Sequence, residues 1–307
     1  MSWFSRKILR ASKIDIKPAM ANPNRKDIAL VAIVKNEAAY IGDWMRFHAL
    51  AGVKDFIIYD NQSDDETLAV LRGFSTLNVT IIPWVLNTTA HKPKMVLPRQ
   101  ILAYCHAIST FGGSFQRMAF IDADEFLVPI GTDSIVASLA PVHSFANISL
   151  PWVMFGHNAH LAMPSDPVPF AYTQRAASQV GKLLNFKCIV DPCDVIQVST
   201  HKFQTRSMAN ETANMAGRTA SNKTRGLGDF VTNTGLQLNH YYLRSQSEMQ
   251  QKMSGTAISG ADQAQRQAAI LKKAELIEKG PIEDRAATDF LRRLGLNSVK
   301  DFREAEL

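Results

Sequence analysis

The chain has 307 residues, is 46% hydrophobic and 20% charged, and carries a formal net charge of +6. This is the composition of an ordinary soluble globular protein, and the length allows one large α/β domain or two smaller ones. The positive excess is modest and no helix-turn-helix, zinc-finger or RNA-binding signature is present, so we expect no nucleic-acid partner. The three cysteines lack metal-type spacing, which argues against a disulfide framework and favours a reducing compartment.

The first 26 residues are interpreted as a basic tail followed by a linker. The stretch "MSWFSRKILRASKIDIK" is basic, and charged residues interrupt its apolar positions, so it has neither the apolar core nor the cleavage site of a signal peptide. It is either a frayed tail or a contact to an anionic membrane surface. No apolar stretch of the chain is long enough to span a bilayer. We therefore expect a cytoplasmic protein whose N-terminus could reach the inner face of the membrane.

From residue 27 onward, apolar runs typical of buried strands alternate with helical patterns. The expected strands cover residues 28–37, 53–60, 78–85 and 117–129, and the expected helices cover 37–52, 65–74 and 98–112. This alternation predicts right-handed crossovers and therefore an α/β fold with a mainly parallel sheet flanked by helices. Ligands bind at the carboxyl ends of such strands, so "KNE", "YDNQSDD" and "DADE", which each follow a strand, should share one rim.

The pattern changes from about residue 140. A mixed-sheet half is expected there, with strands at residues 147–156, 183–192, 194–203 and 236–245. Residues 204–236 are rich in Asn, Thr, Gly and Ser and have few large apolar residues, which predicts a long, mobile loop. The tail from about 245 is mostly helical. We divide the chain into the N-terminal tail at 1–26, a main domain at 27–252 and a helical segment at 253–307.

Three carboxylates stand within four positions of "FIDADEFLVP", directly behind an apolar run. Asp122 and Asp124 would share one face of a strand, because alternate residues of a strand point to the same side. Paired hard oxygen ligands suit Mg²⁺ or Mn²⁺, and a cation would relieve the repulsion between them. The alternative for this stretch is a solvated turn with a helix cap.

Polar residues also follow the earlier strands. Asp60 and Glu37 each come at the end of a strand, where a carboxylate can accept hydrogen bonds from a ribose or a base. The alternative at residues 60–65 is an Asx-rich turn, with Asp64 or Asp65 as the cap of the next helix.

His240, His201 and Lys187 interrupt strand-like segments in the second half of the chain. Imidazole can ligate Mn²⁺ or contact phosphate, and a structural role is the alternative for each residue. A CxxC motif, a GxSxG elbow, a P-loop and a GxGxxG fingerprint are absent, which argues against α/β-hydrolases, NTPases and dinucleotide enzymes.

Together these motifs resemble the GT-A nucleotide-sugar glycosyltransferases, and most closely glycosyltransferase family 92 with related family-2-like bacterial enzymes. The first half contributes Lys-Asn-Glu after the first strand, Trp44 and His48 on the next helix, a Tyr-Asp-Asn-x-Ser-x-Asp turn and Asp-x-Asp-Glu-Phe. The second half contributes Trp-x-x-Phe-Gly from Trp152, a Lys-x-Ile-Val, and Asn-His-Tyr-x-x-Arg-Ser from Asn239. The resemblance spans roughly residues 28 to 252.

This resemblance implies a single GT-A domain that transfers a sugar from a nucleotide-diphosphate donor, with a UDP-sugar favoured. It implies a hexosyltransferase-like, inverting enzyme that acts on a hydroxyl of a glycan, polysaccharide or lipid-linked acceptor. The implied metal is Mn²⁺ or Mg²⁺, held against the diphosphate by Asp122, Asp124 and His240. By analogy, the residues that bind the nucleotide would be Asn36, Glu37, Asp60, Ser63, Asp122 and Lys187.

An inverting enzyme needs a carboxylate that deprotonates the acceptor hydroxyl. No motif identifies this base, and the candidates are Glu125, Asp166 and Asp191. Two other classes of protein stay open. A nucleotidyltransferase could use the same carboxylates, but it would usually need a Gly-rich or basic phosphate loop, which "AIVKNEAAY" does not offer. A non-catalytic binding protein with the same fold would be expected to lack one carboxylate of the pair.

Overall fold

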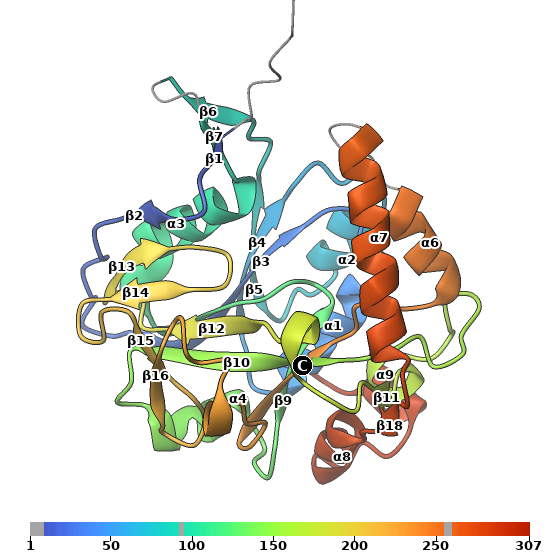
Figure 1. The fold of residues 1–307 in the computed structure, drawn as a ribbon. Coiled ribbons are helices and arrows are strands. Elements are labelled where there is room, and N and C mark those ends of the chain that lie inside the picture. The colour runs from blue at the N-terminus through green and yellow to red at the C-terminus, as the bar shows by residue number, and fades with distance from the viewer. Residues whose placement is uncertain (1–8, 92–94, 255–259) are drawn as a thin grey trace, which may run out of the picture.

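The computed structural model describes residues 9–91, 95–254 and 260–307, and within them a ten-stranded sheet forms the centre of the molecule (Figure 1). Its strands are β3 Lys26–Val34, β4 Asp55–Asp60, β5 Asn78–Pro83, β8 Phe115–Phe120, β9 Glu125–Pro129, β10 Asn147–Met154, β12 Phe186–Val190, β15 Glu211–Ala213, β16 Thr219–Ser221 and β17 Leu236–His240. Eight of them follow the spatial order β16-β15-β10-β12-β8-β3-β4-β5, and β17 pairs with both β10 and β9.

Helices and three small sheets surround this central sheet. The helices are α1 Ile41–Leu50, α2 Thr67–Arg72, α3 Arg99–Phe111, α4 Ile135–Leu139, α5 Val168–Ala171, α6 Gln246–Ser254, α7 Gly260–Ile277, α8 Ala286–Arg293 and α9 Val299–Glu304. The 3-10 turns are η1 Gly112–Ser114, η2 Ala140–Val142, η3 Gly181–Leu183 and η4 Gly228–Phe230. The remaining strands are β1 Leu9–Arg10, β2 Ile14–Asp15, β6 Thr88–Ala90, β7 Met95–Leu97, β11 Gln174–Arg175, β13 Val195–Val198, β14 Phe203–Thr205 and β18 Ile282–Glu283.

The first half of the central sheet is parallel. β3 pairs in parallel with β4 and with β8, and β5 pairs in parallel with β4. Leu30 and Ala32 of β3 belong to the apolar cluster that includes α1, whereas Ala29 and Val31 belong to the cluster that includes α3. A strand covered on both faces needs apolar residues at consecutive positions, which explains the unbroken run in the sequence. The predicted mainly parallel sheet flanked by helices is confirmed.

The second half of the sheet is mixed. β12 runs antiparallel to both β8 and β10, and β10 is parallel to β15 and β17. β17 then pairs antiparallel with β9, and this register places His240 opposite Glu125. A strand from the far end of the chain therefore lies beside the strand that follows the acidic turn. A parallel half joined to a mixed half is the GT-A arrangement that the sequence predicts.

Residues 117–129 form two strands, so the prediction of a single strand here is wrong. β8 ends at Phe120 and β9 begins at Glu125, and the chain turns between them. The Glu125 amide donates to the Asp122 carbonyl at 3.0 Å, and the Asp122 amide donates to Glu125 Oε2 at 2.8 Å. Asp122 and Asp124 thus project from a turn and not from one strand face, and their separate partners determine where each carboxylate lies.

Residues 204–236 contain two strands and buried hydrogen bonds, so the prediction of one long loop is wrong, while the mobility of this segment stays a prediction. β15 and β16 pair with each other, and β15 extends the central sheet beside β10. Arg225 is 2% exposed and donates to Ser149 Oγ and to the His201 carbonyl, both at 2.6 Å. Thr212 donates to the same Ser149 oxygen at 2.8 Å. The polar composition that suggests a loop belongs in part to buried polar groups that have partners.

Part of the predicted N-terminal tail pairs with the rest of the fold. β1 pairs with β7 and β2 pairs with β13, before β3 begins at Lys26. The predicted membrane contact falls partly on residues 1–8, which lie outside the described residues. In the part of the chain that the structure describes, no helix combines the length and the apolar character that crossing a membrane requires.

The C-terminal helices pack onto the same domain. α7 stands beside α6 (Figure 1), and Gln263 and Gln267 of α7 donate to the Met253 carbonyl at 2.7 and 3.3 Å. Phe290 of α8 and Phe302 of α9 are fully buried in the core cluster that also contains α1. The division of the chain into three segments stays a prediction.

Candidate active site

Two loops at the carboxyl end of the parallel strands are tied together, as the sequence predicts. Asn36, which follows β3, has a left-handed backbone with φ of 54°, a conformation that Asn tolerates better than most residues. Its backbone amide donates to Ser63 Oγ at 3.1 Å. Its side chain donates to Asp64 Oδ1 at 2.6 Å and accepts from the Asp64 amide at 2.9 Å. Two of the predicted nucleotide-binding residues, Asn36 and Ser63, are therefore in contact.

Asp60 ends β4 and organises the turn that follows it. The residue is 8% exposed, and its Oδ1 accepts from the Ser63 amide at 3.1 Å, as in an Asx turn. Among the described residues its second oxygen, Oδ2, has no partner, so it can accept from a ligand. α2 has Glu66 as its N-cap, so neither predicted cap residue holds that position, although Asp65 accepts from the Thr67 amide at 2.9 Å.

Asp122 is held by two side chains. Its Oδ1 accepts from Gln100 Nε2 at 2.9 Å, and its Oδ2 accepts from Lys187 Nζ at 2.8 Å. The Lys187 side chain is 1% exposed and also lies 3.5 Å from Glu125 Oε2. Burial disfavours its charge, but the two carboxylates outweigh burial and raise the pKa of Lys187 well above its ordinary value. Lys187 is therefore an internal counter-ion, and its burial does not suit the predicted contact with the nucleotide.

Glu125 is fully buried at the start of β9. Its Oε1 accepts from Trp152 Nε1 at 2.6 Å, while Oε2 accepts from the Asp122 amide. Burial raises the pKa of Glu125 to about 8, although Lys187 opposes this shift. Because both oxygens are engaged inside the protein, this base candidate is not placed to touch an acceptor, and its contacts hold the acidic turn.

Asp124 and His240 lie together although they are far apart in the sequence. His240 Nε2 is 3.3 Å from Asp124 Oδ2, and the Tyr241 amide donates to the Asp124 carbonyl at 2.8 Å. Lys252 Nζ of α6 lies 3.9 Å from the same carboxylate oxygen. Burial disfavours the Asp124 charge, but His240 and Lys252 outweigh burial and lower the pKa of Asp124 below its ordinary value. Two of the three predicted metal ligands are thus neighbours.

His240 is almost completely buried beside Asp124. It is 4% exposed, and its Nδ1 is buried without a hydrogen-bond partner among the described residues. Its ring packs against Trp152 and Tyr242, with ring centroids 4.5 and 5.4 Å away. Burial lowers the pKa of His240, although Asp124 opposes this shift. The imidazole is therefore neutral at neutral pH, which is the form that binds metal ions.

α1 fixes the position of β9. Trp44 Nε1 donates to the Glu125 carbonyl at 2.8 Å, and His48 Nε2 accepts from the Leu127 amide at 3.0 Å. His48 Nδ1 lies 2.8 Å from the Trp44 carbonyl, so Nδ1 carries the proton. Burial lowers the pKa of His48 to about 3. The Trp and His that follow the first strand in the sequence therefore support the strand that begins with Glu125.

Arg244 connects the segment after β17 to the loop that follows β3. Its Nη2 donates to Glu37 Oε2 at 2.8 Å, and its guanidinium carbon lies 4.2 Å from the centre of the Tyr40 ring. Burial raises the pKa of Glu37, although Arg244 opposes this shift. The only sequence signal for Arg244 is its place in the Asn-His-Tyr-x-x-Arg-Ser motif.

Two further cations lie close to the Asp124–His240 pair, and sequence analysis missed both. Lys252 of α6 and Lys273 of α7 lie over the Tyr242 ring, at 3.8 and 4.4 Å from its centre. Both helices are rich in polar residues, which is typical of solvent-exposed helices. The sequence pattern therefore does not distinguish these two lysines from ordinary surface lysines.

The other two base candidates lie apart from this cluster. Asp191 follows β12, which runs antiparallel to β8, so it lies at the opposite edge of the sheet, where it pairs with Arg25. Asp166 is exposed ahead of α5, and the neighbouring Ser165 carbonyl accepts from Arg303 of α9 at 2.6 Å. Within the described residues, Asp166 has no hydrogen bond or ion pair with the acidic turn. The sequence pattern does not give strand direction, which is why it does not exclude Asp191.

The donor atoms at the acidic turn are divided between two directions. Asp124 faces His240, whereas Asp122 faces Lys187 and Gln100. In the described part of the chain, no group of three or more His, Cys, Asp and Glu side chains is arranged to hold a metal ion.

Comparison with known proteins identifies the family of the main domain. The sequence profile of glycosyltransferase family 92 matches residues 31–256. A glycosyltransferase family 92 protein of Ricinus communis is 22% identical over 169 residues, which are 52% of this chain and 28% of that protein. A glycosyltransferase family 92 protein of Oryza sativa subsp. japonica is 25% identical over 158 residues, which are 49% and 25% of the two chains. This chain thus spans about a quarter of the length of these curated relatives.

Solved structures show a weaker likeness. TarS of S. aureus, residues 1–349, aligns with 81% of this chain and 72% of its own, at 14% identity and a TM-score of 0.36. Glucosyl-3-phosphoglycerate synthase from Mycobacterium tuberculosis, in complex with Mn²⁺, UDP-glucose and phosphoglyceric acid, aligns with 45% of this chain and 52% of its own. Its identity is 15% and its TM-score is 0.28. The profile match covers most of the sequence between the N-terminal tail and α7, and by it the chain belongs to glycosyltransferase family 92.

Proposed function

We propose that this protein transfers a hexose from a UDP-sugar to an acceptor hydroxyl. Family membership supports glycosyl transfer as the reaction class. The observation that carries the proposal is the Asp124–His240 contact of 3.3 Å at the rim of the sheet. The joined loops that carry Asn36 and Ser63 lie at the same edge of the sheet. In this proposal the acceptor is a glycan, a polysaccharide or a lipid-linked glycan.

The nucleotide would lie against the loops after β3 and β4. Asp60 is anchored through one carboxylate oxygen and keeps the other for a ribose or base hydrogen bond. Glu37 is held by Arg244, which fixes its side chain at the same rim. The loops are preorganised by their mutual hydrogen bonds, so little ordering would oppose binding.

Two neighbouring groups at the acidic turn, Asp124 and His240, are of the types that bind a divalent cation. Asp124 offers a carboxylate oxygen and His240 a neutral imidazole nitrogen, and a nitrogen ligand favours Mn²⁺ over Mg²⁺. Nδ1 of His240 is buried without a hydrogen-bond partner among the described residues. Packing against Trp152 and the contact of Nε2 with Asp124 therefore hold the ring in place. Asp122, whose side chain is 34% exposed, faces Lys187 and Gln100 and would have to turn from these partners to serve as the third ligand. When bound, the cation would neutralise charge on the leaving diphosphate.

The chain's own cations would act on the same charge. Lys252 lies 3.9 Å from Asp124, and Arg244 forms an ion pair with Glu37 at the rim. Both side chains are therefore fixed before the donor arrives. Fixed positive charge near a leaving diphosphate stabilises the transition state more than mobile solvent does. Glu125 is a positioning residue in this scheme, because it holds the Asp122 amide and Lys187. We include inversion in the proposal, and the anomeric configuration of the product, measured by NMR, tests it.

Thermal unfolding of the full chain tests donor binding. UDP and Mn²⁺ together should raise the melting temperature more than the sum of each alone. Asp124→Asn should lose the Mn²⁺-dependent part of this shift. Asp191→Asn is the matched control, because it makes the same chemical change at the opposite edge of the sheet. Stabilisation by nucleoside triphosphates but not by UDP or UDP-sugars would favour nucleotidyl transfer and contradict the proposal.

A further inference from the structure

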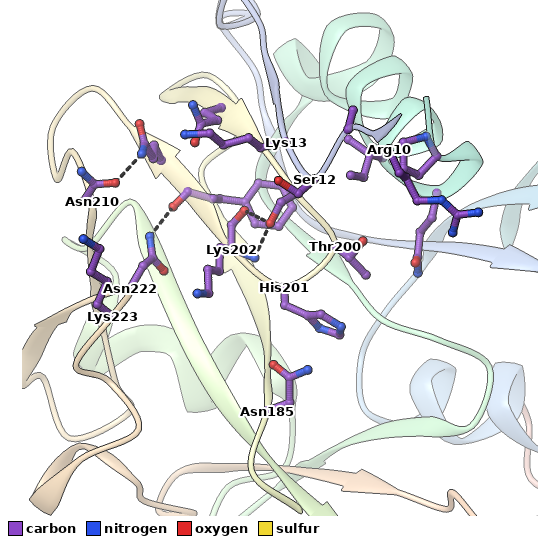
Figure 2. Close-up of a pocket in the computed structure, with 18 residues that line it drawn as sticks. Arg10, Ser12, Lys13, Asn185, Thr200, His201, Lys202, Asn210, Asn222 and Lys223 are labelled. Atoms are coloured by element: carbon purple, nitrogen blue, oxygen red, sulfur yellow. Dashed lines mark hydrogen bonds between the residues drawn. The ribbon is translucent and has the colours of Figure 1, made fainter. Parts of the chain in front are cut away.

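A pocket of about 760 Å³ lies beside the acidic turn and is not used by the donor in the scheme above. Three segments form most of its wall, as Figure 2 shows: the chain between β1 and β2, the start of α3, and the β13–β14 hairpin. The chain after β16 closes one side. None of the residues that line it belongs to the loops after β3 and β4.

The pocket is strongly basic. Arg10, Lys13, Lys202 and Lys223 line it, and no Asp or Glu does (Figure 2). All four side chains belong to exposed residues, and among the described residues none of them is engaged in an ion pair or a hydrogen bond. A concave surface with several unpaired cations attracts anions and raises their local concentration. Amide side chains in the same wall, such as Asn185, add the donors and acceptors that a sugar requires.

Two lining residues connect this pocket to the acidic turn. Gln100 lines the pocket and donates to Asp122 Oδ1 at 2.9 Å. His201 also lines it, and its ring meets the Trp152 ring edge-on at a centroid distance of 5.3 Å. Trp152 in turn donates to Glu125. A molecule in the pocket would therefore be separated from Asp122 by one side chain, Gln100, and from Glu125 by two, His201 and Trp152.

We propose that this pocket binds the acceptor and that the acceptor carries an anionic group, a phosphate or a carboxylate. This inference rests on the proposed function, because it takes the acidic turn as the place where the donor reacts. The donor diphosphate itself is the main rival occupant. It is disfavoured because the residues proposed for the nucleotide lie on loops that contribute nothing to the pocket wall.

The test compares charged and neutral sugars on the full chain. Glucose 6-phosphate and glucuronate, with glucose as the neutral control, are titrated calorimetrically at low salt. The double variant Lys202→Gln/Lys223→Gln removes two pocket cations, and Lys54→Gln/Lys300→Gln removes two exposed lysines elsewhere as the matched control. At least one anionic sugar should bind more tightly than glucose. The pocket variant should lose about tenfold in that affinity, which is about 1.4 kcal/mol for two partly exposed ion pairs, while the control variant should not.

Binding of UDP with Mn²⁺ is measured on the same proteins and separates the two proposals. Unchanged UDP binding in the pocket variant supports an acceptor role, whereas an equal loss of UDP binding would assign the pocket to the donor and overturn the inference. Glucose binding as tightly as both anionic sugars would also overturn it. If phosphatidylglycerol vesicles bind through the same two lysines, the anion is a lipid phosphate and the anionic class stands. If UDP does not bind but the lysine-dependent anion binding remains, the proposed donor chemistry fails and the anion site stands.

Discussion

His48 gives a quantitative test of how α1 supports the acidic turn. Its neutral ring donates through Nδ1 to the Trp44 carbonyl and accepts at Nε2 from the Leu127 amide. Protonation would place a second N–H against the Leu127 N–H and would charge a residue that is fully buried. Lower pH should therefore destabilise the folded protein through this residue, and His48→Gln should remove that part of the pH dependence.

The magnitude follows from the two pKa values of His48. The pKa is about 3 in the folded protein, while an unperturbed histidine has a pKa of about 6.5. Above pH 6.5 both states are neutral and the residue has no effect on the pH dependence. Below it, the unfolded chain binds a proton that the folded protein does not, so the free energy of unfolding falls by about 1.4 kcal/mol per pH unit. The loss reaches about 2 kcal/mol at pH 5 by this relation and continues to about pH 3.

Urea unfolding of wild type and His48→Gln at pH 7.5 and pH 5 measures this loss. Gln can still accept from the Leu127 amide but does not titrate. Burial also lowers the pKa of His201 and His240, so only the difference between the two proteins isolates His48. Wild type should be the more stable at pH 7.5, and its advantage should shrink by about 2 kcal/mol at pH 5. An advantage of equal size at both pH values would refute a neutral, enclosed His48.

Three other substitutions test the remaining parts of the structure. Lys187→Met should lower the free energy of unfolding by about 3 kcal/mol, which is the low end for a broken buried pair because Asp122 is partly exposed. Adding Glu125→Gln should recover part of this loss, and equal urea midpoints for Lys187→Met and wild type would contradict the counter-ion role. Asp191→Asn should leave sugar transfer unchanged, and a large loss of turnover with intact UDP binding would restore it as the base. Arg225→Met should cost about 1–3 kcal/mol in urea unfolding, because the buried groups that it donates to lose their donor.

The parallel half of the fold and the location of the rim were predictable. Consecutive apolar residues such as Ala29 and Leu30 require cover on both faces, and strand–helix alternation then requires parallel pairing. Parallel pairing places all strand ends at one edge, which is why Asn36 and Ser63, 27 positions apart, meet there. The pairing of Asp124 with His240 was available only through the family resemblance, because β17 joins the sheet out of chain order.

The remaining features depend on contacts that no pattern in the sequence encodes. Apolar residues stand before, between and after the acidic residues from Phe120 to Phe126, so periodicity does not mark the turn between β8 and β9. The burial of Arg225 depends on partners in β10 and in the turn between β13 and β14, and without them its segment has the composition of a loop. Lys252 reaches Asp124 from α6 while it packs against the Tyr242 ring just after β17, and its own helix gives no sign of that contact.

The charge balance at the acidic turn explains how three carboxylates are tolerated behind a buried strand. Lys187 compensates both Asp122 and Glu125 from inside the protein, at 2.8 and 3.5 Å from their carboxylate oxygens. Asp124 is compensated by Lys252 at 3.9 Å, so a divalent cation arriving alone would meet an ammonium group that is already present. A diphosphate arriving alone would meet the carboxylates. Bound together, the cation and the diphosphate nearly cancel each other's charge, so each should strengthen the binding of the other. This reciprocity is the reason to expect that UDP and Mn²⁺ stabilise the protein jointly, and that Asp124→Asn reduces the coupling between them as well as the affinity for the metal.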